Sequence, residues 1–391
     1  ELLGDDIGVC GAAGIDRQLA NQWQARASAV VLATGGCAFG ERFIGATGLT
    51  GDGYLMAAEA GAELSGMEMS AQYAVAPAGS SLNKGMPFRW ATFYDAGGCE
   101  LGEPGDDRQI FIARALGRGP VFASLDKAAP HVQAWLRQGQ PNCLLPFDRG
   151  GIDPFNDRFE ITLRCEGTVR GVGGIRLVSD ACHTGVDGLF AAGDVASRED
   201  LVGAISGGGG PNSSWAIASG RWAGEAAAVH AHRERPTRDR RFPMGLGGTG
   251  MHRAGPRRKT AAGAATGPVA ADIFQAVRAE MLPLDRNFFR AAQPLSAALG
   301  RLDDIWRAAR DDLVVSRRAD PTAIVRSREA IAMLATARWS LTAAQARQES
   351  RGMHRRTDYP SIDAAAPRRL HLSGSDPIAI SARTAAAEAA P

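Results

Sequence analysis

The sequence predicts an α/β fold in which one parallel nucleotide-binding sheet is interrupted by an inserted α+β domain and followed by helices. Two short apolar runs carry this prediction. Residues 26–34 are apolar and β-branched and end at Gly35-Gly36, and residues 188–194 repeat this texture and end at Gly193-Asp194. Buried parallel strands that enter tight turns have this composition. The mixed stretch between the two runs, residues 70–170, therefore indicates an insertion into one sheet.

The other elements follow from periodicity. Residues 7–24 alternate loosely, which predicts a small antiparallel hairpin, and Asp52 to Leu64 has an apolar face that predicts a helix. Residues 215–230 are alanine-rich and helical in pattern. An apolar stripe within residues 272–352 predicts a helix hairpin or small bundle. The stripe consists of Ile324, Ala330, Ile331, Leu334, Ala337, Leu341 and Ala344.

These elements divide the chain into six parts. They are the first part of the nucleotide-binding domain (1–69), a capping domain (70–172), the second part of the nucleotide-binding domain (173–232), a basic linker rich in Gly and Pro (233–269), a helical domain (270–360) and a mobile tail (361–391). The basic linker could also be read as a nucleic-acid-binding arm. It lacks interleaved aromatic residues and any folded recognition motif, which favours a solvated linker.

Composition narrows the function classes. Glycine makes up 48 of 391 residues, about 12% against a usual share of about 7%. The net charge of +2 argues against a surface built for a polyanion. No apolar run approaches the roughly 18 residues of a membrane span. The six cysteines lie far apart without a CxxC pair, so the sequence predicts no metal site and a reducing, cytoplasmic setting.

Four glycine-containing segments carry the chemistry. Thr34-Gly35-Gly36 follows the first strand, at a turn where the backbone can approach a ligand, although an ordinary β-turn has the same sequence. Asp52 and Gly53 open the predicted helix, where the aspartate can cap the helix or accept hydrogen bonds from ligand hydroxyls. For both segments, local structure alone and ligand binding each explain the residues present.

The second pair of segments lies after the second strand. Asp194 ends that strand at the edge of the sheet where doubly wound folds bind cofactors. Residues 207–213 form a glycine-rich entry to a helix, where free N–H groups and the helix dipole favour negative charge. A phosphate or a flavin that gains electrons suits such a position.

In this order the segments resemble the flavoprotein-subunit family of succinate dehydrogenase, fumarate reductase, L-aspartate oxidase and adenylylsulfate reductase. The likeness covers roughly residues 5–360, and the matching passages are 30–36, 50–53, 60–62, 67–69, 173–175, 188–194 and 212–213. The segments 349–354 and 358–360 are similar to the C-terminal helical signature of the family.

The resemblance implies a partial FAD-binding, Rossmann-like domain that is interrupted by the capping domain and followed by the helical domain. It implies that FAD is the cofactor and that an electron-transfer partner protein accompanies a small-molecule substrate. The positions that it assigns to FAD are Thr34, Gly35, Gly36, Asp52, Gly53, Asp194, Asn212 and Ser213.

Two departures from the family narrow the function. Family members begin with a βαβ unit that carries Gly-x-Gly-x-x-Gly, and only 28 residues precede Ala29 here, which predicts a fragment, a truncated gene product or a wrongly assigned start. The four dicarboxylate-binding positions of the family fall on Tyr73 or Ala74, near Tyr94, on Val169 and on Gly208. Without paired donors a dicarboxylate is costly to desolvate, so we expect a substrate other than succinate or fumarate.

The sequence leaves the catalytic residues open. Arg170 lies beside a lost histidine position and can bind an anion or simply face solvent. Arg351 and His354 lie in a segment that the family places near the flavin, and an ion-paired helix end explains them equally well. The expected function is therefore hydride or electron transfer between FAD and an unidentified small molecule. The alternative is a non-catalytic remnant that serves at most as a binding or interaction protein.

Overall fold

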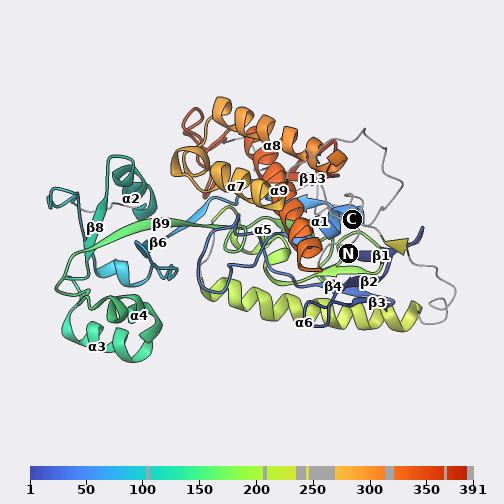
Figure 1. The fold of residues 1–391 in the computed structure, drawn as a ribbon, viewed down its shortest axis with the longest axis horizontal. Coiled ribbons are helices and arrows are strands. Elements are labelled where there is room, and N and C mark those ends of the chain that lie inside the picture. Colours follow the sequence, from blue (N-terminus) through green and yellow to red (C-terminus); the bar gives the residue numbers. More distant parts are fainter. Residues whose placement is uncertain are drawn as a thin grey trace.

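The central feature of the computed structural model is a pair of parallel strands, β4 (Val30–Leu32) and β11 (Leu189–Ala191). The structure describes residues 1–102, 105, 107–205, 209–234, 244–245, 269–312, 321–364 and 368–384. The expectation that two distant apolar runs share one parallel sheet is confirmed, with Leu189 opposite Val30 and Ala191 opposite Leu32. The long helix α6 (Gly209–Glu234) packs on this pair and buries Ala223 and Ala227 against it (Figure 1).

An antiparallel sheet flanks this pair at the N-terminus. Its order is β12 (Met244–Gly245), β1 (Leu2–Gly4), β2 (Val9–Ile15) and β3 (Gln22–Arg26). The predicted hairpin over residues 7–24 is confirmed as β2 and β3. Strand β12 lies within the predicted linker and pairs with β1 instead of remaining unstructured. The rest of that linker, residues 235–243 and 246–268, lies outside the described part of the chain.

The inserted residues form a lobe of their own, which two strands join to the rest of the molecule (Figure 1). Its antiparallel sheet has the order β6 (Gln72–Pro77), β9 (Phe159–Gly167), β8 (Val121–Ser124) and β7 (Thr92–Tyr94). The lobe also contains the 3-10 turn η1 (Pro87–Trp90) and the helices α2 (Arg108–Leu116), α3 (Pro130–Gly139) and α4 (Pro141–Gly150). Phe159 packs against Phe88 and Phe147 in its core.

The helical region contains α7 (Ala270–Met281), the π turn η4 (Leu284–Phe288), α8 (Ala292–Asp312) and α9 (Pro321–Ala346). The apolar stripe lies on α9, but the helix is buried on its other faces as well. Ser327, Arg338 and Ser340 are buried together with the stripe because α1 (Asp52–Glu59), α7, α8 and β13 (Arg368–Ser373) surround α9. The expectation of a single core face is therefore wrong.

Two predictions about where elements end need correction. The helix expected over Asp52–Leu64 ends at Glu59, because Gly61 adopts a left-handed conformation before β5 (Leu64–Ser65). The tail expected to be mobile contains the hairpin of β13 and β14 (Ala379–Thr384). This hairpin joins the sheet β10 (Gly174–Ile175), β5, β13, β14 through the pairing of β13 with β5, and three consecutive residues of β13, Leu370, His371 and Leu372, are buried there.

Candidate cofactor site

The turn that follows β4 lies against another turn of the chain, residues 168–171 between β9 and β10. The Cys37 N–H donates to Thr168 Oγ1 at 2.7 Å, and the Thr168 N–H donates to the Cys37 carbonyl at 3.0 Å. A Cβ atom on Gly36 would lie 2.7 Å from the Val169 nitrogen. Glycine is thus required here so that two protein segments can approach each other, while Thr34 remains exposed to solvent.

The start of α1 completes this arrangement. Gly51 has a φ of 85° and is the N-cap residue, so Asp52 lies in the first turn and does not cap the helix as the sequence suggested. The Asp52 carboxylate accepts a hydrogen bond from the Thr50 hydroxyl. A Cβ on Gly53 would collide with Thr34 Oγ1 and with Val195. The predicted residues of the two N-terminal segments are therefore direct neighbours.

Tyr54 links α1 to the second strand of the pair. Its hydroxyl lies 3.0 Å from Thr168 Oγ1 and 3.1 Å from the carbonyl oxygen of Asp194. Complete burial raises the pKa of Tyr54, so the phenol stays protonated. Tyr54 and Thr168 thus hold three of the predicted segments together. No sequence motif marks either residue, so neither was predicted to belong to the site.

Asp194 lies in the 3-10 turn η2 (Gly193–Val195) directly after β11, with 27% of its side chain exposed. Its carboxylate binds the guanidinium of Arg198, whose side chain is 1% exposed. Burial raises the pKa of the Asp194 carboxyl, and Arg198 opposes that rise. The two residues are four positions apart, but no helix spans them, so this spacing does not predict their contact.

The start of α6 faces the same turn. The Trp215 indole N–H donates to the Gly193 carbonyl at 2.9 Å, and the Gly193 N–H donates to the Ser219 hydroxyl at 3.0 Å. Gly209 has open space where its Cβ would be, and so does Gly210. The glycines at 207 and 208 lie outside the described residues.

Asn212 and Ser213 differ in their surroundings. Asn212 is half-buried near the start of α6, whereas Ser213 is exposed. The Ser213 hydroxyl donates to the Gly209 carbonyl of its own helix at 2.9 Å. This bond occupies the hydroxyl proton, which leaves Asn212 as the freer of the two predicted ligands.

The three catalytic candidates are engaged in contacts of their own. Arg170 pairs at 2.9 Å with Glu166, a buried carboxyl whose pKa burial raises to about 7. Arg351 pairs with Glu349 at 3.0 Å. The segment with Arg351 nonetheless approaches the site, because Met353 packs against Val172.

His354 is fully buried and holds other parts of the fold together. Its Nδ1 lies 2.8 Å from the Arg290 guanidinium and its Nε2 lies 3.1 Å from the Arg347 carbonyl. Burial, with Arg290 beside it, holds the pKa of His354 well below its ordinary value. A neutral imidazole with both nitrogens occupied fits a structural contact better than proton transfer to a substrate.

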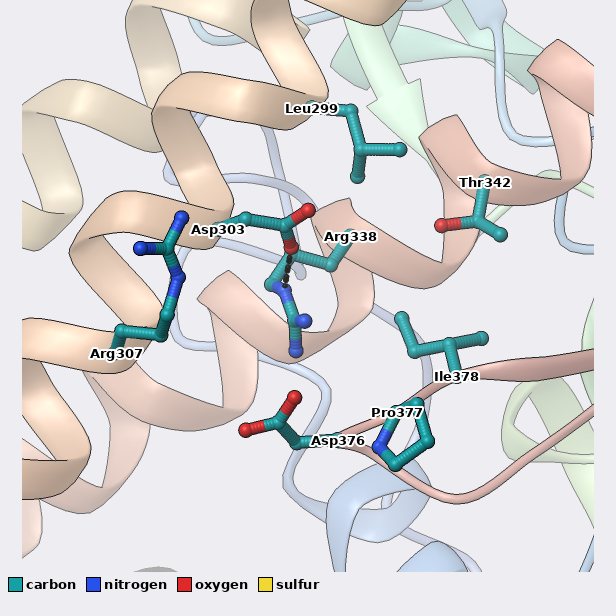
Figure 2. A pocket seen from close by; sticks show the side chains of 8 residues that line it. All are labelled: Leu299, Asp303, Arg307, Arg338, Thr342, Asp376, Pro377 and Ile378. Carbon is teal, nitrogen blue, oxygen red and sulfur yellow. Dashed lines mark hydrogen bonds and ion pairs between the residues drawn. The ribbon is translucent and has the colours of Figure 1, made fainter.

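Two shallow pockets among the described residues lie away from these segments. A pocket of about 320 Å³ is lined by Leu299, Asp303, Arg307, Arg338, Thr342, Asp376, Pro377 and Ile378 (Figure 2). In it, Arg338 is already paired with Asp303 at 2.6 Å and donates to the Ser375 carbonyl. A second pocket, of about 380 Å³, lies at residues 358–363 and Gln348. None of the predicted cofactor residues lines either pocket.

The comparisons with known proteins bear on the fold. A family model described as the fumarate reductase flavoprotein C-terminal region matches residues 280–378. Sdh1 of Mycobacterium smegmatis, solved in complex with UQ1, superposes with a TM-score of 0.73 at 24% identity, over 98% of this chain and 66% of that one. The chain has the fold of the succinate dehydrogenase and fumarate reductase flavoprotein subunits. The resemblance seen in the sequence is thereby confirmed.

Two further solved structures with the flavoprotein fold are covered by this chain to a similar share of their length. A mutant form of the E. coli quinol fumarate reductase subunit FrdA gives a TM-score of 0.75 at 21% identity, over 100% of this chain and 71% of that one. Adenylylsulfate reductase from Archaeoglobus fulgidus gives 0.70 at 19% identity, over 98% and 71%. The chain thus spans about two thirds of these solved proteins. No curated protein matches it.

Some of the residues that would hold FAD leave room for a ligand, and others do not. Gly36, Gly53, Gly173 and Gly174 are already approached by protein atoms. The groups that remain open to a ligand are Thr34, which is exposed, and Gly209 with Gly210 at the start of α6. Exposed backbone at a helix start next to a partly buried carboxylate fits a polar, anionic cofactor. The described residues contain no cluster of metal-binding side chains and no helix long and apolar enough to cross a bilayer.

Proposed function

We propose that the chain is the major part of an FAD-dependent oxidoreductase that transfers hydride or electrons between flavin and a small molecule other than succinate or fumarate. When bound, the flavin supplies the redox chemistry. The chain would hold and orient it: Asp194 would accept hydrogen bonds from ribityl hydroxyls, Thr34 would contact the ribose or diphosphate region, and Asn212 would contact the pyrimidine edge. The positive end of α6 favours the charge that develops on reduction.

One observation carries this proposal: segments that lie far apart in the sequence meet around the carboxyl ends of β4 and β11. The Gly35-Gly36 turn, the start of α1, residues 168–171 and η2 are connected through Thr168, Tyr54 and Arg198. The carboxyl edge of a parallel sheet is where doubly wound folds bind cofactors.

The surroundings of the family's dicarboxylate positions support a different substrate. The Tyr73 hydroxyl donates into the protein, 3.1 Å from the Leu282 carbonyl, and its ring packs on Phe288. Val169 is buried. The Arg158 guanidinium lies 3.7 Å from the centre of the Tyr94 ring. These groups supply no paired cationic donors for two carboxylates, which favours a less charged substrate.

We further propose that the working enzyme includes additional parallel strands beside β4 and β11 and an electron-transfer partner protein. Parallel sheets occur almost only as larger, covered sheets, whereas the described residues contribute two parallel strands. The exposed side chains of Ile217 and Trp222 on α6 are consistent with further protein packing there. The six cysteines are all unpaired and five are buried, which supports a reducing, cytoplasmic compartment.

Flavin retention tests this function. The purified chain is mixed with FAD, alone and together with a separately expressed Gly-x-Gly-x-x-Gly βαβ unit, and bound flavin is measured by visible absorbance after gel filtration. We expect near-equimolar flavin in at least one of these samples. Asp194→Ala and Asn212→Ala should each weaken retention. Ser213→Ala is the matched control and should leave it unchanged, because that hydroxyl bonds within its own helix.

The alternative is the non-catalytic remnant. The protein contacts that already fill the Cβ positions of Gly36 and Gly53 favour it, because those contacts persist without any ligand. Colourless protein in both samples would support the remnant and reject the enzyme. Retained flavin with unchanged affinity in both the Asp194 and Asn212 variants would show that the flavin lies elsewhere.

A further inference from the structure

Arg198 is a buried cation in contact with the candidate cofactor site. It directly precedes the short helix α5 (Glu199–Val202), and its side chain is 1% exposed. One terminal nitrogen donates to the Asp194 carboxylate. The other lies within hydrogen-bond distance of three backbone carbonyls, those of Thr168 (3.5 Å), Val169 (3.4 Å) and Gly171. The guanidinium thus connects the turn after β11 to the turn between β9 and β10.

The backbone of the 168–171 turn explains why a guanidinium is needed. Carbonyl groups that point into the protein require donors, and the turn itself does not supply enough of them. Arg198 provides several N–H groups in one rigid plane, whereas a lysine ammonium is a compact point charge on a flexible stem. The backbone N–H of Arg198 also donates to the Val172 carbonyl at 2.9 Å, which fixes the arginine to the same turn.

The same turn closes the Gly35-Gly36 segment. Thr168 exchanges hydrogen bonds with Cys37, and Val169 lies where a Cβ of Gly36 would be. A shift of the 168–171 turn would therefore move the Gly35-Gly36 turn as well. A shift of Arg198 would also release the Asp194 carboxylate, because Arg198 is the hydrogen-bond donor that holds it.

We propose that Arg198 is a positioning residue for the cofactor: it holds the Asp194 carboxylate and the 168–171 turn in one arrangement, so that Asp194 and the Gly35-Gly36 turn meet the same ligand. This inference rests on the proposed FAD function and adds a residue that no cofactor motif contains. Arg198 acts through Asp194 and Thr168 and does not touch the ligand itself. Its Nε is buried without a hydrogen-bond partner in the described chain, so pairing alone does not account for its burial.

A purely structural role predicts a different outcome, and the chain offers a matched control. Arg356 also has a side chain that is 1% exposed and binds one carboxylate, that of Asp358, and backbone carbonyls, including that of Ala344 at 3.0 Å. It lies in the helical region. Arg198→Lys and Arg356→Lys both keep a positive charge and lose the planar fork. If Arg198 serves only stability, the two variants should behave alike.

The experiment measures three quantities in wild type, Arg198→Lys and Arg356→Lys. These are FAD retention, the thermal midpoint and the hydrogen exchange of amides in residues 168–172 without flavin. We expect Arg198→Lys to weaken FAD retention about 10-fold or more and to speed exchange in the turn. Arg356→Lys should lower the thermal midpoint to a similar extent without either effect.

Chemical rescue gives a second variant. In Arg198→Ala, low concentrations of guanidinium ion should restore part of the FAD retention, because the carboxylate and the three carbonyls still form a site for a planar cation. The same addition should not help Asp194→Ala. Guanidinium that restores nothing, in protein shown to be folded by circular dichroism, would count against the positioning role.

The outcomes separate this inference from the proposed function. Wild-type protein that never takes up flavin overturns both. Wild-type protein that binds flavin, with retention unchanged in Arg198→Lys or reduced equally in Arg356→Lys, overturns the role of Arg198 and leaves the FAD function intact. Unchanged exchange of residues 168–172 in Arg198→Lys would likewise show that the arginine does not hold the turn.

Discussion

Two buried arginines in different regions, Arg198 and Arg356, each bind a carboxylate, but they donate different numbers of hydrogen bonds to it. Each has a side chain that is 1% exposed and binds one carboxylate and several backbone carbonyls. Arg356 binds Asp358 with two parallel hydrogen bonds of 2.7 and 2.8 Å. Arg198 reaches Asp194 through one nitrogen only. The helical region has the bidentate geometry of a strong ion pair, and the candidate site does not.

The two carboxylates respond accordingly. The pKa of Asp358 lies below its ordinary value, chiefly because of the hydrogen bonds from Arg356. The pKa of Asp194 is raised, because burial outweighs the contribution of Arg198. An incompletely compensated carboxylate at the edge of a parallel sheet costs stability, which is common at functional sites. The difference indicates that the Arg356 contact stabilises the fold, whereas the Arg198 contact arranges a site.

The largest expected effect comes from removing each arginine. Arg198→Ala and Arg356→Ala each leave a partly buried carboxylate and buried carbonyls without a donor, which should lower the unfolding free energy by about 3–5 kcal/mol. Urea unfolding measures this loss. FAD retention, measured on the fraction that remains folded, should disappear in Arg198→Ala only. Equal retention in the two variants would remove the distinction between the regions.

The second expected effect concerns how the free energy of unfolding depends on pH: Asp358 and Asp194 should contribute to this dependence with opposite signs. Because the folded-state pKa of Asp358 is depressed, its contribution is present above the unfolded value of about 4 and is lost as pH falls below it. The folded-state pKa of Asp194 is raised, so its ionisation costs stability as pH rises above that unfolded value. Asp358→Asn should therefore reduce the acid sensitivity of unfolding, and Asp194→Asn should increase it.

Urea unfolding from pH 3 to pH 6 measures both slopes, since about pH 4 is where the unfolded aspartates titrate. Arg170 is the other charged group that acts on Asp194, so Asp194→Asn is also compared in an Arg170→Gln background. Slopes of the same sign for the two aspartates would contradict the contrast between the regions.

The sequence predicted the elements that short-range patterns mark, and it missed contacts between distant segments. The two parallel strands and the β2–β3 hairpin were found because alternation and glycine turns are local signals. Arg198 was missed because its partners Thr168 and Gly171 come from a distant part of the chain. The hairpin at residues 368–384 was missed because the buried run of β13, Leu370, His371 and Leu372, is short and does not alternate with exposed residues.

Strand order predicts that the candidate cofactor segments are neighbours, but it does not predict their individual contacts. Thr34 lies against Gly53, and Tyr54 bonds to the Asp194 carbonyl, whereas Gly36 lies against Thr168 and Val169. The sequence assigned the glycines to ligand approach, whereas the structure has other protein segments against Gly36 and Gly53. A glycine motif reports close approach, and the sequence alone does not say whether a ligand or the chain itself approaches.

The ion pair of Glu166 with Arg170 differs from the first two pairs, because here the carboxyl is buried and the arginine is partly exposed. Burial raises the pKa of Glu166 from 4.5 to about 7. Protonation is therefore favoured by folding, and stability should fall as pH rises from 4.5 to about 7. Glu166→Gln should remove the contribution of Glu166 to that slope, while Glu199, whose pKa burial also raises to about 7, keeps its own. The amide introduced by Glu166→Gln can also donate to the Asn83 Oδ1, which is buried without a hydrogen-bond partner in the described chain.

Thermal midpoints at pH 5 and pH 8 test this prediction. The wild-type midpoint should be lower at pH 8, and the Glu166→Gln midpoint should differ less between the two conditions. Glu41→Gln is the control, because Glu41 pairs with Arg164 near the same strands and its side chain is 14% exposed. A Glu166→Gln protein that keeps the wild-type pH difference would show that another group titrates.

The smallest expected effect distinguishes a connected site from separate contacts. Tyr54→Phe removes a hydroxyl within hydrogen-bond distance of both Thr168 and the Asp194 carbonyl, and should cost about 1 kcal/mol of unfolding free energy. Because Arg198 binds the same two segments, the double variant Tyr54→Phe/Arg198→Lys should differ from the sum of the single changes by at least about 0.5 kcal/mol. The pair Tyr54→Phe/Arg356→Lys should be additive, since Arg356 contacts neither segment. Additivity in both double-mutant cycles would mean that Tyr54 and Arg198 stabilise their turns independently, and the four segments would then be neighbours without forming one positioned site.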